Sequence, residues 1–134
     1  MSEPFELHPQ LAKDSIWLAD WPLSQLRLIN DTNYPWFILV PRRANIRDVI
    51  DLTEADQSTL WQESAKLSQL LRVKYNPEKL NLAALGNMVP QLHLHHVARY
   101  STDVAWPAPI WGKVAAKPYT EQQVSQLQQE WSVA

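Results

Sequence analysis

Three of the four histidines in this 134-residue chain fall between Gly86 and Arg99, and two of them, His93 and His95, are two residues apart. In a β-strand, residues at this spacing point to one face and lie roughly 7 Å apart, so both side chains can touch one phosphate group. A neutral imidazole is a nucleophile toward phosphorus, and a second imidazole can donate a proton or a hydrogen bond to the oxygens that gain charge. The spacing predicts phosphoryl or nucleotidyl transfer by this pair.

The alternation around the pair separates a polar face from an apolar one. Gln91 and Val97 share the face of the two histidines, whereas His96 points to the other face with Leu92 and Leu94. Since leucines on one face of a strand belong to the core, we expect His96 to be a structural histidine.

The loop before the histidines can supply hydrogen-bond donors from its backbone. Gly86 permits close approach of the chain to a ligand, and the N–H groups of Asn87 and Met88 follow it directly. This arrangement predicts a small anion cradle that needs no basic side chain.

Two other interpretations compete with catalysis. His93 and His95 can be exposed strand residues without a task, or they can ligate zinc together with His8. No nearby carboxylate or cysteine completes a zinc site, so we expect neither a metal nor a cofactor, and His8 is assigned a structural role. Arg99 is expected to be exposed and solvated, outside the site.

Short β-prone runs predict the strands that hold this segment. Turn residues and prolines separate these runs along the chain. The expected strands are residues 15–20, 26–30, 36–40, 80–85 and, for the strand that carries the histidines, about 91–99.

Capping residues predict the helices. Thr53 is a suitable N-cap for a helix from about Glu54 to Tyr75, which Asn76 and the following proline end. Thr120 and Gln123 form a capping box before a final amphipathic helix. Strands, a helix, strands and a helix in this order predict an α+β fold with a five-stranded antiparallel sheet and packed helices.

The composition is that of a single globular domain over residues 1–134, with 46% hydrophobic residues, a net charge of −2 and no cysteine. This charge gives no basic surface for a nucleic acid duplex, and no run of residues suits a membrane span. Residues 1–9 lack the features of a secretory signal, so a cytoplasmic location is expected. The tryptophan- and proline-rich residues 105–118 either close the pocket or cover a neighbouring subunit.

Residues 91–97 (Gln-Leu-His-Leu-His-His-Val) resemble the signature of the histidine triad (HIT) family, in which histidines alternate with apolar residues. Residues 86–89 (Gly-Asn-Met-Val) are similar to the Gly-Gln-Ser/Thr-Val that commonly precedes it, and the order of elements agrees from about residue 15 to 100. Residues 101–134 form a less diagnostic C-terminal extension. The resemblance implies an antiparallel sheet with packed helices, a homodimer, and action on nucleoside phosphates through a covalent nucleotidyl-histidine without a redox cofactor.

By position in the signature, the resemblance implies that His93 is the nucleophile and that His95 holds phosphate oxygens. The first histidine of the signature is replaced by Gln91, whose amide can bind a phosphate oxygen but cannot shuttle a proton near pH 7. Many members also have a histidine where this chain has Trp36. The resemblance implies substrate-binding roles near the ribose for Asn30, Asp31 and Asn81.

The sequence therefore predicts a nucleotide hydrolase or nucleotidyltransferase that acts at the α-phosphate of a nucleoside phosphate derivative or dinucleoside polyphosphate. The alternative is a non-catalytic nucleotide-binding protein with a degenerate triad, which kept the pocket but lost turnover through the changes at Gln91 and Trp36. The leaving group and the preferred base stay open.

Overall fold

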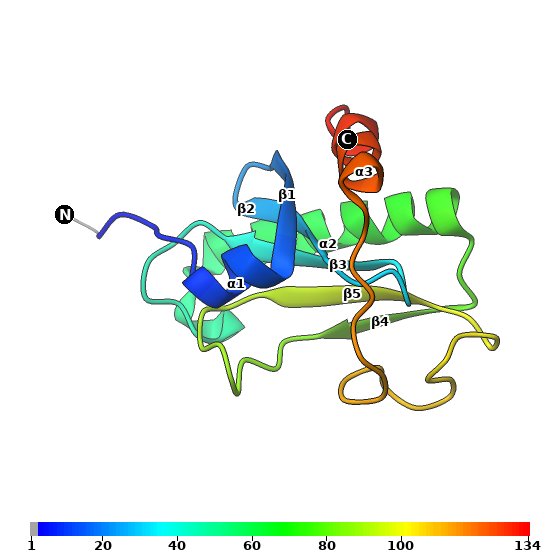
Figure 1. Ribbon diagram of the computed structural model, residues 1–134. Coiled ribbons are helices and arrows are strands. Elements are labelled where there is room, and N and C mark those ends of the chain that lie inside the picture. Colours follow the sequence, from blue (N-terminus) through cyan, green and yellow to red (C-terminus); the bar gives the residue numbers. More distant parts are fainter. Residues whose placement is uncertain (1–2) are drawn as a thin grey trace.

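The computed structural model describes residues 3–134, which form one antiparallel five-stranded sheet with packed helices (Figure 1). The fold class is α+β, as predicted. Along the chain the elements are α1 (Pro9–Asp14), β1 (Ser15–Asp20), β2 (Ser24–Ile29), β3 (Trp36–Pro41), a 3-10 turn (Val49–Asp51), α2 (Glu54–Tyr75), β4 (Lys79–Ala83), β5 (Leu94–Arg99) and α3 (Glu121–Trp131).

The strand order is β1-β2-β3-β5-β4, so the last strand of the chain lies inside the sheet. In the register of β5 with its neighbours, His95 pairs with Ile38 of β3 on one side and with Ala83 of β4 on the other. The backbone of His95 is thus held by strands on both sides, which fixes the direction of its side chain.

The strand that carries the histidines is shorter than predicted, because it begins at Leu94 and not at Gln91. Its pairing with β3 runs only as far as Leu39 opposite Leu94, and β4 ends at Ala83. Residues 91–93 therefore continue beyond the sheet, where they have no neighbouring strand.

The two faces of the sheet are covered differently. Helix α2 packs on one face, where Leu60, Leu67 and Leu71 form a single core with Phe37 and Leu39 of β3. In Figure 1, α2 runs along the sheet on the side away from the viewer. The alternate residues of β3 face the opposite side, where α1 and the C-terminal segment before α3 lie.

Helix α2 has the predicted bounds because both of its ends are encoded locally. The side chain of Thr53 accepts a hydrogen bond from the backbone N–H of Asp56, which satisfies one of the free donors of the first turn. At the other end, Asn76 adopts a left-handed conformation with φ of 47° and ends the helix before Pro77.

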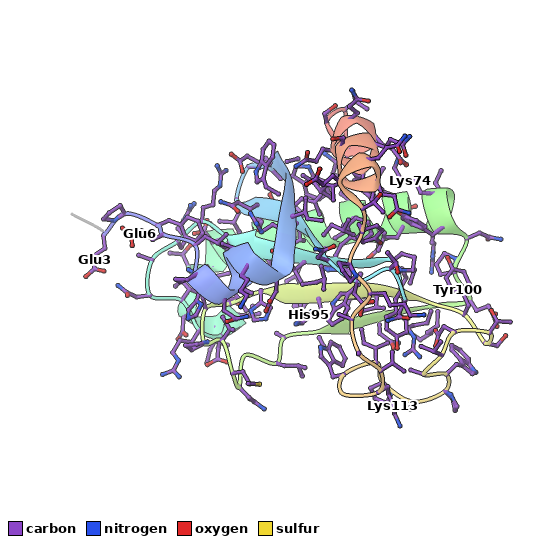
Figure 2. All side chains as sticks on the ribbon, viewed as in Figure 1. Glu3, Glu6, Lys74, His95, Tyr100 and Lys113 are labelled. Atoms are coloured by element: carbon purple, nitrogen blue, oxygen red, sulfur yellow. The ribbon has the colours of Figure 1, made fainter. Side chains whose placement is uncertain are left out.

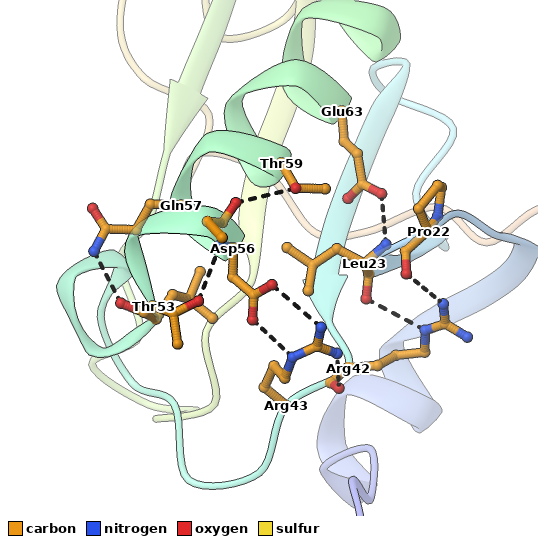
Figure 3. A network of polar contacts seen from close by, with 11 residues as sticks. Pro22, Leu23, Arg42, Arg43, Thr53, Asp56, Gln57, Thr59 and Glu63 are labelled. Atoms are coloured by element: carbon orange, nitrogen blue, oxygen red, sulfur yellow. Dashed lines mark hydrogen bonds and ion pairs between the residues drawn. The ribbon is translucent and has the colours of Figure 1, made fainter.

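A polar network joins the first turns of α2 to the turn between β1 and β2 and to the residues that follow β3 (Figure 3). The Arg43 guanidinium pairs with Asp56 at 2.8 Å, and the Glu63 carboxylate accepts a hydrogen bond from the backbone N–H of Leu23 at 2.9 Å. Arg42 donates to the carbonyl oxygen of Leu23. These contacts fix α2 against the hairpin and leave the opposite face of the sheet free for the pocket.

The prediction that Arg99 is exposed and solvated is wrong. Its side chain is only 2% exposed and pairs with the buried carboxylate of Asp103 at 2.8 Å. It also donates to Asn81 Oδ1 at 2.7 Å and to the carbonyl oxygen of Ala108 at 2.8 Å. The chain after β5 folds back over the guanidinium, and a buried charge needs this full set of partners.

Among residues 3–134, no helix combines the length and the apolar character that crossing a membrane requires.

Candidate active site

A cavity of about 750 Å³ opens on the face of the sheet opposite α2. His93 and His95 line it, as the predicted alternation of residues requires, while Leu92 and Leu94 belong to the core below α2. The remaining wall comes from α1, the end of β2, the loop at residues 85–89, Trp36 and the C-terminal segment from residue 111 to 118.

His93 is held through one ring nitrogen. Its Nδ1 lies 2.7 Å from the carbonyl oxygen of Gln91, and because a carbonyl oxygen only accepts hydrogen bonds, this nitrogen carries the hydrogen. Nε2 then has a free lone pair. Burial lowers the pKa of His93, against the opposing effect of the Gln91 hydrogen bond, so the imidazole is neutral near pH 7. A neutral, oriented imidazole is the form that attacks phosphorus.

His95 lies beside His93 and is 5% exposed, with the two ring centroids 4.8 Å apart. Its Nδ1 accepts a hydrogen bond from the indole N–H of Trp36 at 2.9 Å. Burial lowers the pKa of His95 to about 3, with smaller contributions from His93 and His96. The site therefore holds two uncharged imidazoles at neutral pH.

His96 has the structural role expected from its place on the other face of β5. It is fully buried against α2, where its Nε2 lies 2.7 Å from Ser64 Oγ and its Nδ1 lies 3.1 Å from the carbonyl oxygen of Leu94. Both nitrogens are thus engaged, and burial lowers the pKa of His96 to about 4.

Gln91 lies beside the N-terminal arm, residues 3–8, and does not line the cavity. Its Nε2 donates to the carbonyl oxygen of Glu6 at 2.8 Å, and its Oε1 accepts from the backbone N–H of His8 at 2.8 Å. In Figure 2, Glu6 marks this arm and His95 lies on β5. The amide that replaces the first histidine of the signature therefore fastens the arm to the chain just before His93.

Asn30 and Asp31, for which the resemblance implies a role near the ribose, both line the cavity. Asn30 Oδ1 accepts a hydrogen bond from the backbone N–H of Tyr119 at 2.8 Å, and Asp31 Oδ1 accepts from the N–H of Asn33 at 2.9 Å and of Lys117 at 3.3 Å. These bonds hold the C-terminal segment against the end of β2, so the two residues shape the pocket through the backbone of that segment.

The loop residues Gly86, Asn87 and Met88 also line the cavity. Gly86 has a φ of 67°, a conformation that favours glycine, and Met88 is 94% exposed at the mouth. Asn81 does not line the cavity, since its side chain is on β4 and accepts from Arg99.

The tryptophan- and proline-rich residues 105–118 were expected either to close the pocket or to cover a neighbouring subunit, and part of this segment lines the pocket. Trp111 joins the wall, with its ring 5.2 Å from the ring of His95 and 6.1 Å from that of Trp36. Lys13 of α1 also reaches the wall and was not predicted. The concentration of tryptophan and proline in residues 105–118 was the available signal for Trp111, whereas nothing in the sequence marked Lys13.

Residues 3–134 contain no group of three or more His, Cys, Asp or Glu side chains placed to hold a metal ion. The imidazole of His8, the third ligand considered for zinc, caps α1 by accepting a hydrogen bond from the N–H of Gln10.

Comparison with known proteins relates this geometry to one family. The family model of the HIT domain matches residues 10–102. A histidine triad protein from Marinobacter aquaeolei has 45% sequence identity and a TM-score of 0.93, with 96% of this chain and 93% of that chain covered. A histidine triad protein from Bradyrhizobium japonicum has 40% identity and a TM-score of 0.91, with 96% and 98% covered.

A third histidine triad protein, from Sinorhizobium meliloti, has 40% identity and a TM-score of 0.90, with 95% of this chain and 96% of that chain covered. The similarity to these structures thus extends over the C-terminal segment that the family model leaves out. No curated protein matches the chain significantly.

Proposed function

This chain belongs to the HIT domain family of nucleotide-binding hydrolases and transferases, and from that premise we propose that His93 attacks the α-phosphorus of a nucleoside phosphate derivative. The observation that carries the proposal is the hydrogen bond from His93 Nδ1 to the Gln91 carbonyl oxygen, which leaves Nε2 as the nucleophilic nitrogen in a cavity of about 750 Å³. Fixing the attacking atom in this way removes much of the entropic cost of the reaction.

The reaction has two steps. The Nε2 lone pair of His93 forms a bond to the α-phosphorus, and the bond from phosphorus to the leaving group breaks with its electron pair on the leaving group, which takes up a proton from solvent. A water molecule then attacks the same phosphorus, the bond from nitrogen to phosphorus breaks, and His93 regains its lone pair while the proton of the water passes to solvent. The products are the free leaving group and a nucleoside monophosphate.

The charges around the cavity favour a substrate with a single charged phosphate. Lys13 is the one lysine or arginine that lines the cavity among residues 3–134, and two carboxylates, Asp14 and Asp31, also line it. A polyphosphate chain needs several cations to offset its charge. We therefore favour a nucleoside phosphate derivative over a dinucleoside polyphosphate.

We assign the other contacts by position. We propose that the backbone N–H groups of Asn87 and Met88, whose loop lines the cavity, bind phosphate oxygens and that the ribose lies toward Asn30 and Asp31. We propose that Gln91 acts only through the arm that it holds, because both ends of its amide are engaged there. Asn81 is proposed to act through Arg99 and not through the substrate.

We also propose a homodimer and a cytoplasmic location. The first is the usual assembly of histidine triad proteins and is measured by sedimentation equilibrium. The second agrees with a chain that has no cysteine.

The test is the intact mass of the protein after brief incubation with an adenosine phosphoramidate and, separately, with diadenosine polyphosphates, without acid quenching. We expect a nucleotidyl adduct on the wild type and on the control variant Trp61→Phe, whose ring lies on α2 and is half exposed. The adduct is expected to be absent from His93→Ala.

The second candidate is a non-catalytic nucleotide-binding protein. It is favoured by Gln91, because an amide cannot deliver a proton to a leaving group near pH 7. Nucleotide binding without an adduct or turnover in the wild type would establish this candidate in place of the first.

A further inference from the structure

The tryptophan at the start of β3 makes a hydrogen bond inside the site. The indole Nε1 of Trp36 lies 2.9 Å from Nδ1 of His95, and Trp36 and His95 both line the cavity. Their ring centroids are 5.8 Å apart. Trp36 sits two residues along β3 from Ile38, the partner of His95 in the sheet register.

An indole N–H can only donate a hydrogen bond, so the nitrogen that faces it must be an acceptor. Nδ1 of His95 is therefore free of hydrogen. A neutral imidazole carries its single hydrogen on the other nitrogen, so Nε2 of His95 is an N–H donor. The opposite tautomer would place two donors against each other at 2.9 Å.

The donor cannot turn away easily, because other rings hold it. Tyr34 contacts the Trp36 ring edge-on at 6.4 Å between centroids, and Trp111 contacts it perpendicularly at 6.1 Å. Trp111 also packs against His95 at 5.2 Å. These contacts fix the orientation of both partners in the hydrogen bond.

We propose that Trp36 is a positioning residue that selects the tautomer of His95 and so aims its Nε2–H at the phosphate oxygens next to the His93 nucleophile. The Nε2 atoms of the two histidines then have complementary roles, one as a nucleophile and one as a hydrogen-bond donor. The His93 hydrogen bond to the Gln91 carbonyl leaves a lone pair on its Nε2, whereas the His95 hydrogen bond from Trp36 leaves a hydrogen on its Nε2. One imidazole attacks and its neighbour stabilises the developing negative charge.

The hydrogen bond from His95 Nε2 to phosphate oxygens rests on the proposed function. The tautomer of His95 does not rest on it. Burial is the main cause of the lowered pKa of His95, and it keeps the ring in the neutral state that this tautomer requires.

The direct experiment is nitrogen-15 NMR of the imidazole side chains at pH 7, in long-range correlation spectra that show which ring nitrogen carries hydrogen. It requires no variant, so it does not depend on a mutant that folds. We expect wild-type His95 to have hydrogen on Nε2 and none on Nδ1, and we expect the reverse for His93. Hydrogen on Nδ1 of wild-type His95 would refute the proposal.

The matched variant is Trp36→Phe, which keeps an aromatic ring and removes the donor. We expect its His95 to become a mixture of tautomers and its kcat to fall about tenfold with an unchanged KM, because one oriented hydrogen bond to the transition state is lost. Trp61→Phe, on the exposed side of α2, is expected to change neither quantity. A Trp36→Phe protein with wild-type His95 resonances and kcat would overturn the role of Trp36.

If the wild type shows no turnover of any nucleotide, the proposed function fails, and the spectra of the wild type and Trp36→Phe still decide the positioning role by themselves.

Discussion

The two ends of β5 carry buried polar side chains of different kinds. At the start of the strand, His95 and the residue just before the strand, His93, are uncharged, and each has one ring nitrogen bound within the protein. At its end, Arg99 is charged and its guanidinium is bound to Asp103, Asn81 and a backbone carbonyl. Both ends are almost completely buried.

Burial alone therefore does not distinguish a functional side chain from a structural one in this protein. The two kinds of side chain differ in whether a side-chain nitrogen that is not bound within the protein faces the cavity. Within residues 3–134, Nε2 of His93 and of His95 has no hydrogen-bond partner and belongs to a cavity wall, while the Arg99 donors face the folded C-terminal segment. A nitrogen that faces an open cavity can bind a ligand, whereas the guanidinium of Arg99 is already bound within the protein.

His93→Ala is the most direct test of whether the histidines near the start of β5 are functional and Arg99 at its end is structural. We expect kcat/KM for an adenosine phosphoramidate to fall by at least about 10⁴-fold, because the proposed nucleophile is removed. The free energy of unfolding is expected to change by less than about 1 kcal/mol, since the imidazole makes one hydrogen bond to a backbone carbonyl. Steady-state kinetics and urea unfolding measure the two quantities.

Arg99→Ala is expected to have the opposite profile. Removing one partner of a buried ion pair leaves Asp103 without its counter-charge, so we expect a loss of about 3–5 kcal/mol in the free energy of unfolding. Arg72→Ala, at an exposed position of α2, is the control and should change the stability by less than about 0.5 kcal/mol. A stable Arg99→Ala protein with low activity would reverse the roles of the two ends.

The buried histidines predict how stability depends on pH. The pKa of His96 is lowered to about 4 in the folded protein, so between that value and the unfolded value of about 6.5 the unfolded chain binds more protons. Stability from this group is complete above pH 6.5 and is lost as the pH falls toward 4. His95, with a pKa of about 3, acts in the same direction.

We expect the free energy of unfolding to fall by about 2 kcal/mol for each of His95 and His96 between pH 7 and pH 5. In His96→Gln the dependence should lose the contribution of one histidine, although the variant is less stable at every pH. Urea unfolding at the two pH values measures this, and an unchanged pH dependence in His96→Gln would contradict the assignment.

What the sequence predicted well depends on interactions between near neighbours. Thr53 caps α2 through a residue three positions on, and Thr120 does the same for α3, so both helix starts were predictable. The shared cavity of His93 and His95 follows from alternation along one extended segment. The family resemblance pointed to the same segment as the candidate site.

What the sequence did not predict depends on contacts between distant parts of the chain. Gln91 meets Glu6 across 85 positions and Trp36 meets His95 across 59, and no local pattern encodes either hydrogen bond. The burial of Arg99 arises only when the chain after β5 folds back. The predicted start of β5 was wrong for the same reason, because the start of this strand is set by where the strands that pair with it end.

The smallest expected effect is that of substituting Gln91. This substitution tests whether the amide only holds the N-terminal arm or also takes part in the reaction. If the amide only holds the arm, Gln91→Ala should lower the free energy of unfolding by about 1 kcal/mol and should speed amide hydrogen exchange at His8, whose N–H it accepts. The control is Gln62→Ala on the exposed side of α2.

The kinetics of Gln91→Ala then decide what the replaced histidine means for this protein. We expect kcat within about threefold of the wild type, because the amide neither lines the cavity nor contacts His93 through its side chain, while the backbone carbonyl that orients His93 is retained. A loss of a hundredfold with an intact arm would show that the amide reaches the phosphates during the reaction. In that case the start of β5 would use three side chains for chemistry, as the family signature does, and not the two that the cavity brings together.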